Sequence, residues 1–236
     1  IFIAQHEAES KFFRVEASVI EKILNGSKLS VTDVGARGGI EDGLKKYQHL
    51  LKLTLVEPVD DPKAPLKKNK EINIIRYLIG GEDGKGVLNI CEKEAVSSIL
   101  DPTGKFIDYY SSGDTEKFDV IKRISLPMKT IKSAIKDTGG QLDYLKLDTQ
   151  GSELEILMGL GDFRPIIIKT EISFIPIYKD SAIYFHLGNF LYDIGYILFH
   201  TTYAGKSSPE KHKTNKPYDE TIIPLHGDAW FMPDWT

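Results

Sequence analysis

The chain has 236 residues, of which 41% are hydrophobic and 27% are charged, and this composition excludes intrinsic disorder because enough apolar side chain is present to offset the entropy of ordering the chain. The 30 lysine and arginine residues against 34 aspartate and glutamate residues give a net charge of −4, which disfavours general DNA or RNA binding. A single cysteine, Cys91, excludes disulfide bonds within the chain and a thiolate zinc site.

Other whole-chain features concern location and extent. No run of about 18 consecutive apolar residues occurs, so we expect no transmembrane span. The lack of cysteine pairs fits a reducing compartment, and we expect a cytoplasmic protein. Because the chain begins with Ile1 instead of methionine, we expect it to be part of a larger chain. We make no prediction of the oligomeric state.

The first half of the chain alternates predicted helices with short apolar strands. Apolar residues recur at helical spacing in the first helix, and an Asn-Gly pair ends it. The predicted elements of this half are helices over 16–25 and near 40–49, strands over 29–35, 51–58, 72–81 and 121–129, and a hairpin or irregular excursion over 87–100.

The second half continues this alternation. Its predicted elements are helices over 130–140, 152–160 and about 182–194, and strands over 142–148, 165–173, 195–200 and 229–232. Strands that alternate with helices predict a mostly parallel sheet covered on both faces. In such sheets ligands bind beyond the carboxyl ends of the strands, so the residues that follow each strand are the candidates for chemistry.

A glycine-rich turn, DVGARGG over 33–39, follows the first predicted strand. Its glycines permit a sharp turn and a close ligand approach. The spacing differs from the G-x-G-x-x-G of dinucleotide-binding turns, which disfavours a nicotinamide-dependent oxidoreductase. The acid Asp33 suits a cationic or amine-bearing ligand better than a pyrophosphate, because like charges repel. A plain glycine-rich turn without a ligand is the alternative.

An acid, Glu57, ends the second predicted strand in the sequence LVEP over 55–58. A carboxylate at that place can accept hydrogen bonds from both hydroxyls of a ribose, as in nucleoside-binding α/β folds. A solvated acid at the end of a strand is the alternative. Together with the glycine-rich turn, Glu57 favours ribose binding.

Two further acids are expected at neighbouring strand ends. Asp148 ends the strand over 142–148, and Lys146 points to the same face because side chains alternate along a strand. Glu171 ends the apolar run of the next strand and should lie beside Asp148 if the two strands are neighbours. Such a pair could share a proton, hold a metal or bind a hydroxylated substrate. Glu153, in the first turn of a helix, suits a capping role.

These motifs together resemble the FkbM-like family of S-adenosylmethionine-dependent methyltransferases. DVGARGG resembles its cofactor-binding turn, VEP its ribose-binding acid, LKLDTQGSELEIL its strand-four motif and TEISFIPIY its strand-five region. The resemblance covers roughly residues 30–200 and the last strand. It implies a class I methyltransferase (Rossmann-like) fold, with a seven-stranded, mostly parallel sheet whose last strand is antiparallel. Arg37, where small residues are usual, and Gln150, where the family often has an acid, depart from the pattern.

The resemblance also implies a cofactor site for S-adenosylmethionine. We expect Asp33 or nearby carbonyls to meet its ammonium group, Glu57 its ribose, and the region from Gly80 to Asp83 its adenine, with Ser98 as a further neighbour. The residues expected at the cofactor are Asp33, Gly35, Ala36, Arg37, Gly38, Glu57, Pro58, Gly80, Asp83, Ser98 and Asp148.

The general base is expected among four residues, Asp148, Glu171, His200 and His226. A histidine titrates near neutrality, which suits proton removal from a weakly acidic hydroxyl, although a strand-end histidine is more often a surface or packing residue. A divalent metal held by Asp148 and Glu171 is a minority alternative, and we expect no metal.

The expected activity is methyl transfer to a hydroxyl of a sugar, glycan or secondary metabolite. A non-catalytic cofactor-binding or scaffold domain with the same fold is the alternative, and an oxidoreductase is a weaker one. We divide the chain into an N-terminal helical extension (1–28) and a methyltransferase domain (29–236). The long polar insertion over 201–228 carries several lysines, which fits either a lid that attracts an anionic acceptor or a solvated loop.

Overall fold

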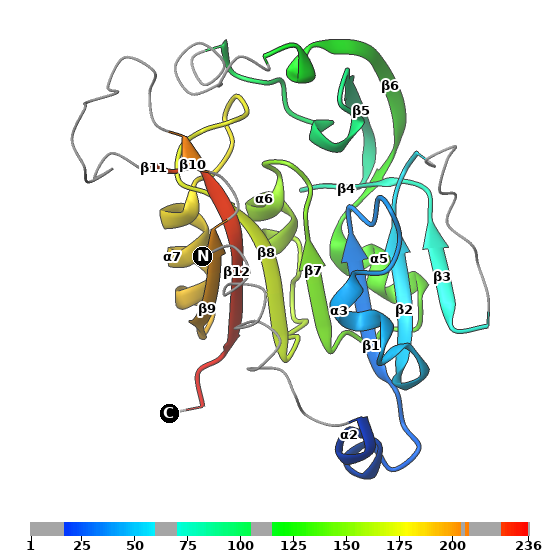
Figure 1. Ribbon diagram of the computed structural model, residues 1–236. Coiled ribbons are helices and arrows are strands. Elements are labelled where there is room, and N and C mark those ends of the chain that lie inside the picture. Colours follow the sequence, from blue (N-terminus) through cyan, green and yellow to red (C-terminus); the bar gives the residue numbers. More distant parts are fainter. Residues whose placement is uncertain (1–16, 60–69, 105–114, 204–205, 208–222, 236) are drawn as a thin grey trace.

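The computed structural model describes residues 17–59, 70–104, 115–203, 206–207 and 223–235, and every structural statement below concerns these residues. Their centre is a seven-stranded sheet with the order β3-β2-β1-β7-β8-β12-β9 (Figure 1). Its strands are β1 (Leu29–Val34), β2 (Leu51–Val56), β3 (Ile72–Ile75), β7 (Tyr144–Leu147), β8 (Ile167–Ser173), β9 (Tyr196–Tyr203) and β12 (His226–Pro233). Neighbouring strands run parallel except at β12, which is antiparallel to both β8 and β9. This is the class I methyltransferase-like fold that the sequence predicts.

Helices cover both faces of this sheet. They are α3 (Asp42–Lys45), α5 (Ile131–Asp137), α6 (Glu153–Met158) and α7 (Tyr184–Asp193), whereas α2 (Ala17–Leu24) lies beyond the amino end of β1 (Figure 1). On one face, α5, α6 and α7 bury apolar residues against the strands, as Leu157 and Leu191 do beside Leu145 (Figure 1). On the other face, Leu44 of α3 packs with Val31. The two clusters follow the alternation of side chains along each strand.

A second, three-stranded sheet stands beside the carboxyl ends of β1 and β2 (Figure 1). It contains β4 (Leu78–Ile79), β6 (Val120–Lys129) and β5 (Gly84–Cys91), with β5 antiparallel and β4 parallel to β6. A short 3₁₀ helix, η2 (Glu94–Val96), follows β5. This small sheet places Leu78, Leu88 and Ile90 in a buried cluster of their own.

Most predicted elements are confirmed, but three differ in extent. The strand expected over 72–81 is two strands, because the chain leaves the central sheet after Ile75 and β4 pairs with β6 instead. The helix expected near 40–49 is the short α3 followed by a 3₁₀ turn, η1 (Gln48–Leu50). The hairpin expected over 87–100 is only an isolated bridge between Asn89 and Ser98, since β5 takes β6 as its ladder partner.

The polar insertion expected over 201–228 is shorter than the sequence indicates. β9 continues to Tyr203 and β12 begins at His226, and these two strands pair as far as Tyr203 and Gly227. Beyond them, β10 (Lys206–Ser207) pairs with β11 (Ile223–Pro224). Residues 204–205 and 208–222, with most of the predicted lysine cluster, lie outside the described residues, as do residues 1–16 of the predicted N-terminal extension. In the part of the chain that the structure describes, no helix combines the length and apolar character that crossing a membrane requires.

Candidate cofactor and acceptor site

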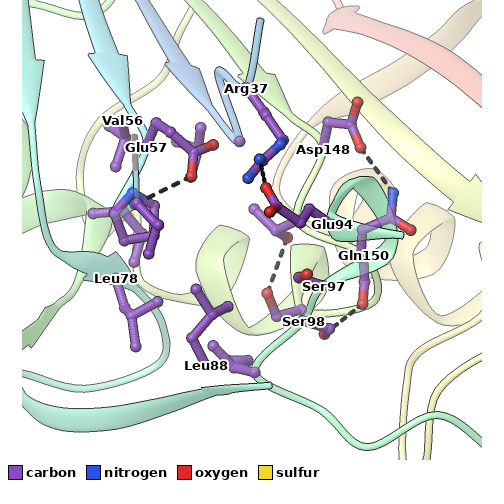
Figure 2. A pocket seen from close by; sticks show the side chains of 18 of the residues that line it. Arg37, Val56, Glu57, Leu78, Leu88, Glu94, Ser97, Ser98, Asp148 and Gln150 are labelled. Carbon is purple, nitrogen blue, oxygen red and sulfur yellow. Dashed lines mark hydrogen bonds and ion pairs between the residues drawn. The ribbon is translucent and has the colours of Figure 1, made fainter. Parts of the chain in front are cut away.

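A cavity of about 370 Å³ lies where the carboxyl ends of β1, β2 and β7 face the small sheet (Figure 2). Its lining includes these residues: Val34, Gly35, Arg37, Gly38, Val56, Glu57, Pro58, Leu78, Ile79, Leu88, Ile90, Glu94, Ser97, Ser98, Asp148 and Gln150. The position obeys the rule that ligands of parallel sheets bind beyond the strand ends. The volume is that of a small-molecule pocket.

One side of the cavity is apolar. Leu78, Leu88 and Ile90 of the small sheet line the cavity together with Val56 at the end of β2. Each of these side chains is at least nine-tenths buried. Sequence reasoning missed this wall, because Leu78 and Leu88 meet only through the pairing of β4 and β5 with the distant strand β6. Such a surface fits the flat, weakly polar face of a nucleobase.

Glu57 stands at the end of β2 and points into the cavity beside this wall (Figure 2). It is only 7% exposed, and its Oε1 accepts a hydrogen bond of 3.3 Å from the backbone N–H of Val59. Pro58 directly after it also lines the cavity. A buried carboxylate at the mouth of a cavity suits a ligand with hydroxyl donors.

The glycine-rich turn connects β1 to the cavity. The backbone N–H groups of Gly35 and Ala36 both donate to the carbonyl of Val56, at 3.0 and 3.1 Å. Gly35 has a φ of +85°, and a Cβ there would lie 1.9 Å from the backbone oxygen of Asp148. Glycine is therefore required at this position by the approach of β7 as well as by the turn. Gly35 and Gly38 line the cavity, and Ala36 is buried.

An ion pair between Arg37 and Glu94 crosses the cavity (Figure 2). Arg37 belongs to the glycine-rich turn, and Glu94 belongs to η2 after the small sheet. Both side chains line the cavity from opposite sides. A guanidinium in this position can bind a carboxylate through two parallel hydrogen bonds.

Asp33 lies inside the sheet and outside the cavity lining. It is 2% exposed, and its Oδ1 accepts a hydrogen bond of 2.9 Å from Lys146 Nζ on the neighbouring strand β7. The pKa of Asp33 is raised, because burial outweighs the attraction of the lysine. Lys146 also lies 4.0 Å from Asp148.

Asp148 and Glu171 lie side by side, as expected for the ends of the neighbouring strands β7 and β8. The side-chain nitrogen of Gln150 donates to both of them, at 3.0 Å to Asp148 Oδ1 and 2.7 Å to Glu171 Oε2. On the other side of Glu171, its Oε1 lies 3.3 Å from His226 Nδ1 at the start of β12. Asp148, which lines the cavity, is thus connected through Gln150 to the Glu171–His226 pair.

The pKa values of both members of the Glu171–His226 pair are raised. Burial raises the pKa of Glu171 to about 7, against the opposing effect of the hydrogen bond with His226. The pKa of His226 is raised mainly by that hydrogen bond. A buried carboxyl with a raised pKa in contact with a histidine is typical of an acid–base pair.

Metal binding finds little support in this geometry. In the described ranges of the chain, no three His, Cys, Asp or Glu side chains converge as a metal site requires. The hydrogen-bond donor of Gln150 stands between Asp148 and Glu171, where a shared cation would bind.

Other residues expected at the cofactor or as the base have different surroundings. Asp83 is exposed outside the cavity lining and accepts hydrogen bonds from Thr130 N at 2.6 Å and Ser133 Oγ at 2.8 Å, which lowers its pKa. Asp83 thus binds the start of α5, whose N-cap residue is Thr130. Gly80 packs against β6, and His200 packs against the Trp230 ring in a tilted arrangement with 4.9 Å between ring centroids.

Ser98 and Glu153 support the turn between β7 and α6. Ser98 Oγ donates to the Gln150 carbonyl at 2.7 Å, and Ser98 also lines the cavity. Buried Glu153, the first residue of α6, accepts hydrogen bonds from the backbone N–H groups of Thr149 and Gly151 in the turn before the helix. Lining residues that sequence reasoning missed are Glu94 and the apolar wall; apart from hydrophobicity, no sequence signal marks them.

A family model described as "Methyltransferase FkbM domain" matches residues 33–198. Among solved structures, the chain is similar to Burkholderia thailandensis 1,6-didemethyltoxoflavin-N1-methyltransferase with bound 1,6-didemethyltoxoflavin and S-adenosylhomocysteine. That similarity has 12% sequence identity and a TM-score of 0.37, and it covers 99% of this chain and 86% of the other. No curated protein matches the chain.

Proposed function

We propose that this chain, which belongs to the FkbM methyltransferase family and is an S-adenosylmethionine-dependent methyltransferase, methylates a hydroxyl oxygen of a sugar, glycan or secondary metabolite. The single observation that supports this is the Glu171–His226 contact of 3.3 Å beside the cavity. A hydroxyl must lose its proton as it is methylated, so it requires a base, whereas a neutral amine is already nucleophilic.

The cavity fits the cofactor in its chemistry. The apolar wall of Leu78, Leu88 and Ile90 would hold the adenine, and Glu57 at the end of β2 would accept the hydroxyl hydrogens of the ribose. Two charged residues would meet the zwitterionic methionine part: Arg37 its carboxylate and Asp148 its ammonium group. We assign the ammonium group to Asp148 instead of Asp33, because Asp33 is already paired with Lys146 and does not line the cavity.

When bound, S-adenosylmethionine supplies a methyl group on a sulfonium that is a good leaving group. The protein therefore has two tasks: it must align the acceptor oxygen, and it must take its proton. Glu171 orients the imidazole through His226 Nδ1, and this leaves Nε2 as the atom that accepts the proton. Asp148, at 43% side-chain exposure between this pair and the cavity, would keep the acceptor near the transferred group.

The acceptor is proposed to be a small molecule or glycan. Whether it is anionic depends on the lysines of the 201–228 insertion, three of which (Lys211, Lys213 and Lys216) lie outside the described residues, so the lid interpretation stays a prediction. The division into a 1–28 extension and a 29–236 catalytic domain, and the cytoplasmic location, likewise stay proposals.

The test is methyl transfer from isotope-labelled S-adenosylmethionine to a panel that pairs each hydroxyl acceptor with its amine analogue. Products are identified by mass spectrometry, and cofactor binding is measured separately by isothermal titration. Oxygen methylation supports the proposal, and nitrogen methylation alone would overturn it. Tight cofactor binding with no transfer to any acceptor would favour the non-catalytic alternative.

A further inference from the structure

The side chain of Gln150 lines the cavity (Figure 2) and also contacts Glu171 of the Glu171–His226 pair. Its Nε2 donates one hydrogen to Asp148 and the other to Glu171. Its Oε1 lies 2.9 Å from the hydroxyl of Tyr178, which also lies 2.8 Å from the carbonyl of Val96. Both amide hydrogens are therefore committed to carboxylates.

The orientation of this amide is dictated by its neighbours. Ionised carboxylates only accept hydrogen bonds, so the NH₂ group, and not the carbonyl oxygen, must face Asp148 and Glu171. In the opposite orientation, the amide oxygen of Gln150 would face the carboxylate oxygens of Asp148 and Glu171, so three hydrogen-bond acceptors would lie against one another. The Tyr178 hydroxyl can donate to Gln150 Oε1, so the observed orientation also gives that oxygen a donor.

The backbone holds Gln150 in an uncommon conformation. Its φ is +60°, in the left-handed region that residues other than glycine seldom adopt. Gly151 follows with a φ of +107°, and a Cβ there would lie 3.1 Å from both Tyr178 and Ser181 side-chain atoms. Ser98 Oγ also donates to the Gln150 carbonyl. A strained turn that is held this firmly beside a cavity suggests a role for the side chain it carries.

The amide restricts where a proton on Glu171 can reside. Because Nε2 of Gln150 donates to Oε2 of Glu171, this contact favours a proton of the carboxyl on Oε1, which faces His226 Nδ1. With Glu171 ionised, Oε1 instead accepts the Nδ1–H of the imidazole. In both cases proton exchange is confined to the Oε1–Nδ1 contact.

We propose that Gln150 is a positioning residue, whose amide directs Glu171 Oε1 to His226 Nδ1 and so keeps His226 in the tautomer that presents Nε2 to the acceptor. This inference rests on the proposed function, in which His226 takes the hydroxyl proton. The charged and titratable groups that face this pair from neighbouring elements are Asp148, Glu153 and Asp228.

Gln150→Glu tests this directly, because it keeps the shape and replaces the donor with an acceptor. We expect kcat, measured at saturating cofactor and acceptor, to fall about 10²-fold, the usual contribution of a general base. In a His226→Asn background the same substitution should have less than about a threefold further effect on kcat, because the residue it acts through is gone. Gln141→Glu, the same change at an exposed position, is the matched control.

A readout independent of catalysis uses ¹⁵N NMR of the His226 ring in the cofactor-free protein. At a pH above the titration of the Glu171–His226 pair, the wild type should show neutral imidazole protonated at Nδ1, and Gln150→Glu should show a mixture of tautomers. If Gln150→Glu folds poorly, Tyr178→Phe is measured instead. It removes only the hydroxyl that faces Gln150 Oε1, and it should shift the tautomer equilibrium of the His226 ring in the same direction. An unchanged tautomer in both variants, or equal losses of kcat with and without His226, would overturn the inference. Absence of methyl transfer by the wild type would instead contradict the proposed function.

Discussion

Lys146 on β7 and Asp33 on β1 are paired in the sheet register, and their side chains form an ion pair of 2.9 Å in the interior. The lysine side chain is 12% exposed and the aspartate side chain 2%. This pair joins the two central strands directly below the turn that carries Arg37. It explains why an acid begins the glycine-rich motif without lining the cavity.

Lys146→Met should therefore destabilise the fold, because it leaves the carboxylate of Asp33 buried without a partner. We expect a loss of about 3–5 kcal/mol in the free energy of unfolding, measured by urea denaturation. The double variant Asp33→Asn with Lys146→Met should recover most of the loss and bind the cofactor within about threefold of wild type. A double variant that folds but no longer binds the cofactor would restore Asp33 as a ligand.

Glu57→Ala should weaken cofactor binding by about 10- to 100-fold, because a missing carboxylate leaves two ribose hydroxyls without acceptors. Isothermal titration with S-adenosylhomocysteine measures this effect. Glu82→Ala, which removes an exposed acid outside the cavity, is the control. Equal affinities of the Glu57 and Glu82 variants would show that ribose binding occurs elsewhere.

Glu94→Gln should strengthen cofactor binding, whereas Arg37→Ala should weaken it. Glu94 forms an ion pair with Arg37 in the lining of the cavity, so a bound carboxylate must compete with it for the guanidinium. We expect a change of about 3- to 10-fold in Kd in opposite directions, with a smaller Glu94 effect at high salt. If both variants weaken binding equally, the ion pair supports the bound state instead of competing with it.

The pH dependence of methyl transfer follows from the Glu171–His226 pair. His226 accepts a proton only when it is neutral and Glu171 is ionised, so kcat should rise as pH increases through the titration of the pair, above about pH 7. Glu171→Gln removes the carboxylate that raises the pKa of His226. The rising limb of the variant should therefore move to lower pH while its plateau falls. A limb that stays in place or moves to higher pH would exclude this pair as the base.

The rule that ligands bind at the carboxyl ends of parallel strands predicted part of the site. The alternation of side chains and the apolar run before Glu171 placed this acid beside Asp148, and Glu57 was found from its place after β2. These predictions succeeded because strand ends of a parallel sheet meet at one edge.

The remainder depended on long-range pairing. The strand expected over 72–81 is divided because β4 pairs with β6, some fifty residues further along the chain. As a result, Asp83 lies at the start of α5 instead of at the cavity. The part played by Gln150 follows from a left-handed backbone and from Tyr178 on a distant loop. Neither the pairing of β4 with β6 nor the contacts of Gln150 leave a periodic pattern in the sequence.

The most direct test of the whole account is transfer of a labelled methyl group to a hydroxyl acceptor, compared between the wild type and His226→Asn at saturating cofactor. The account predicts oxygen methylation by the wild type and a rate reduced about 10²-fold or more in the variant, with unchanged cofactor affinity. Equal rates of oxygen methylation in the two proteins would contradict it.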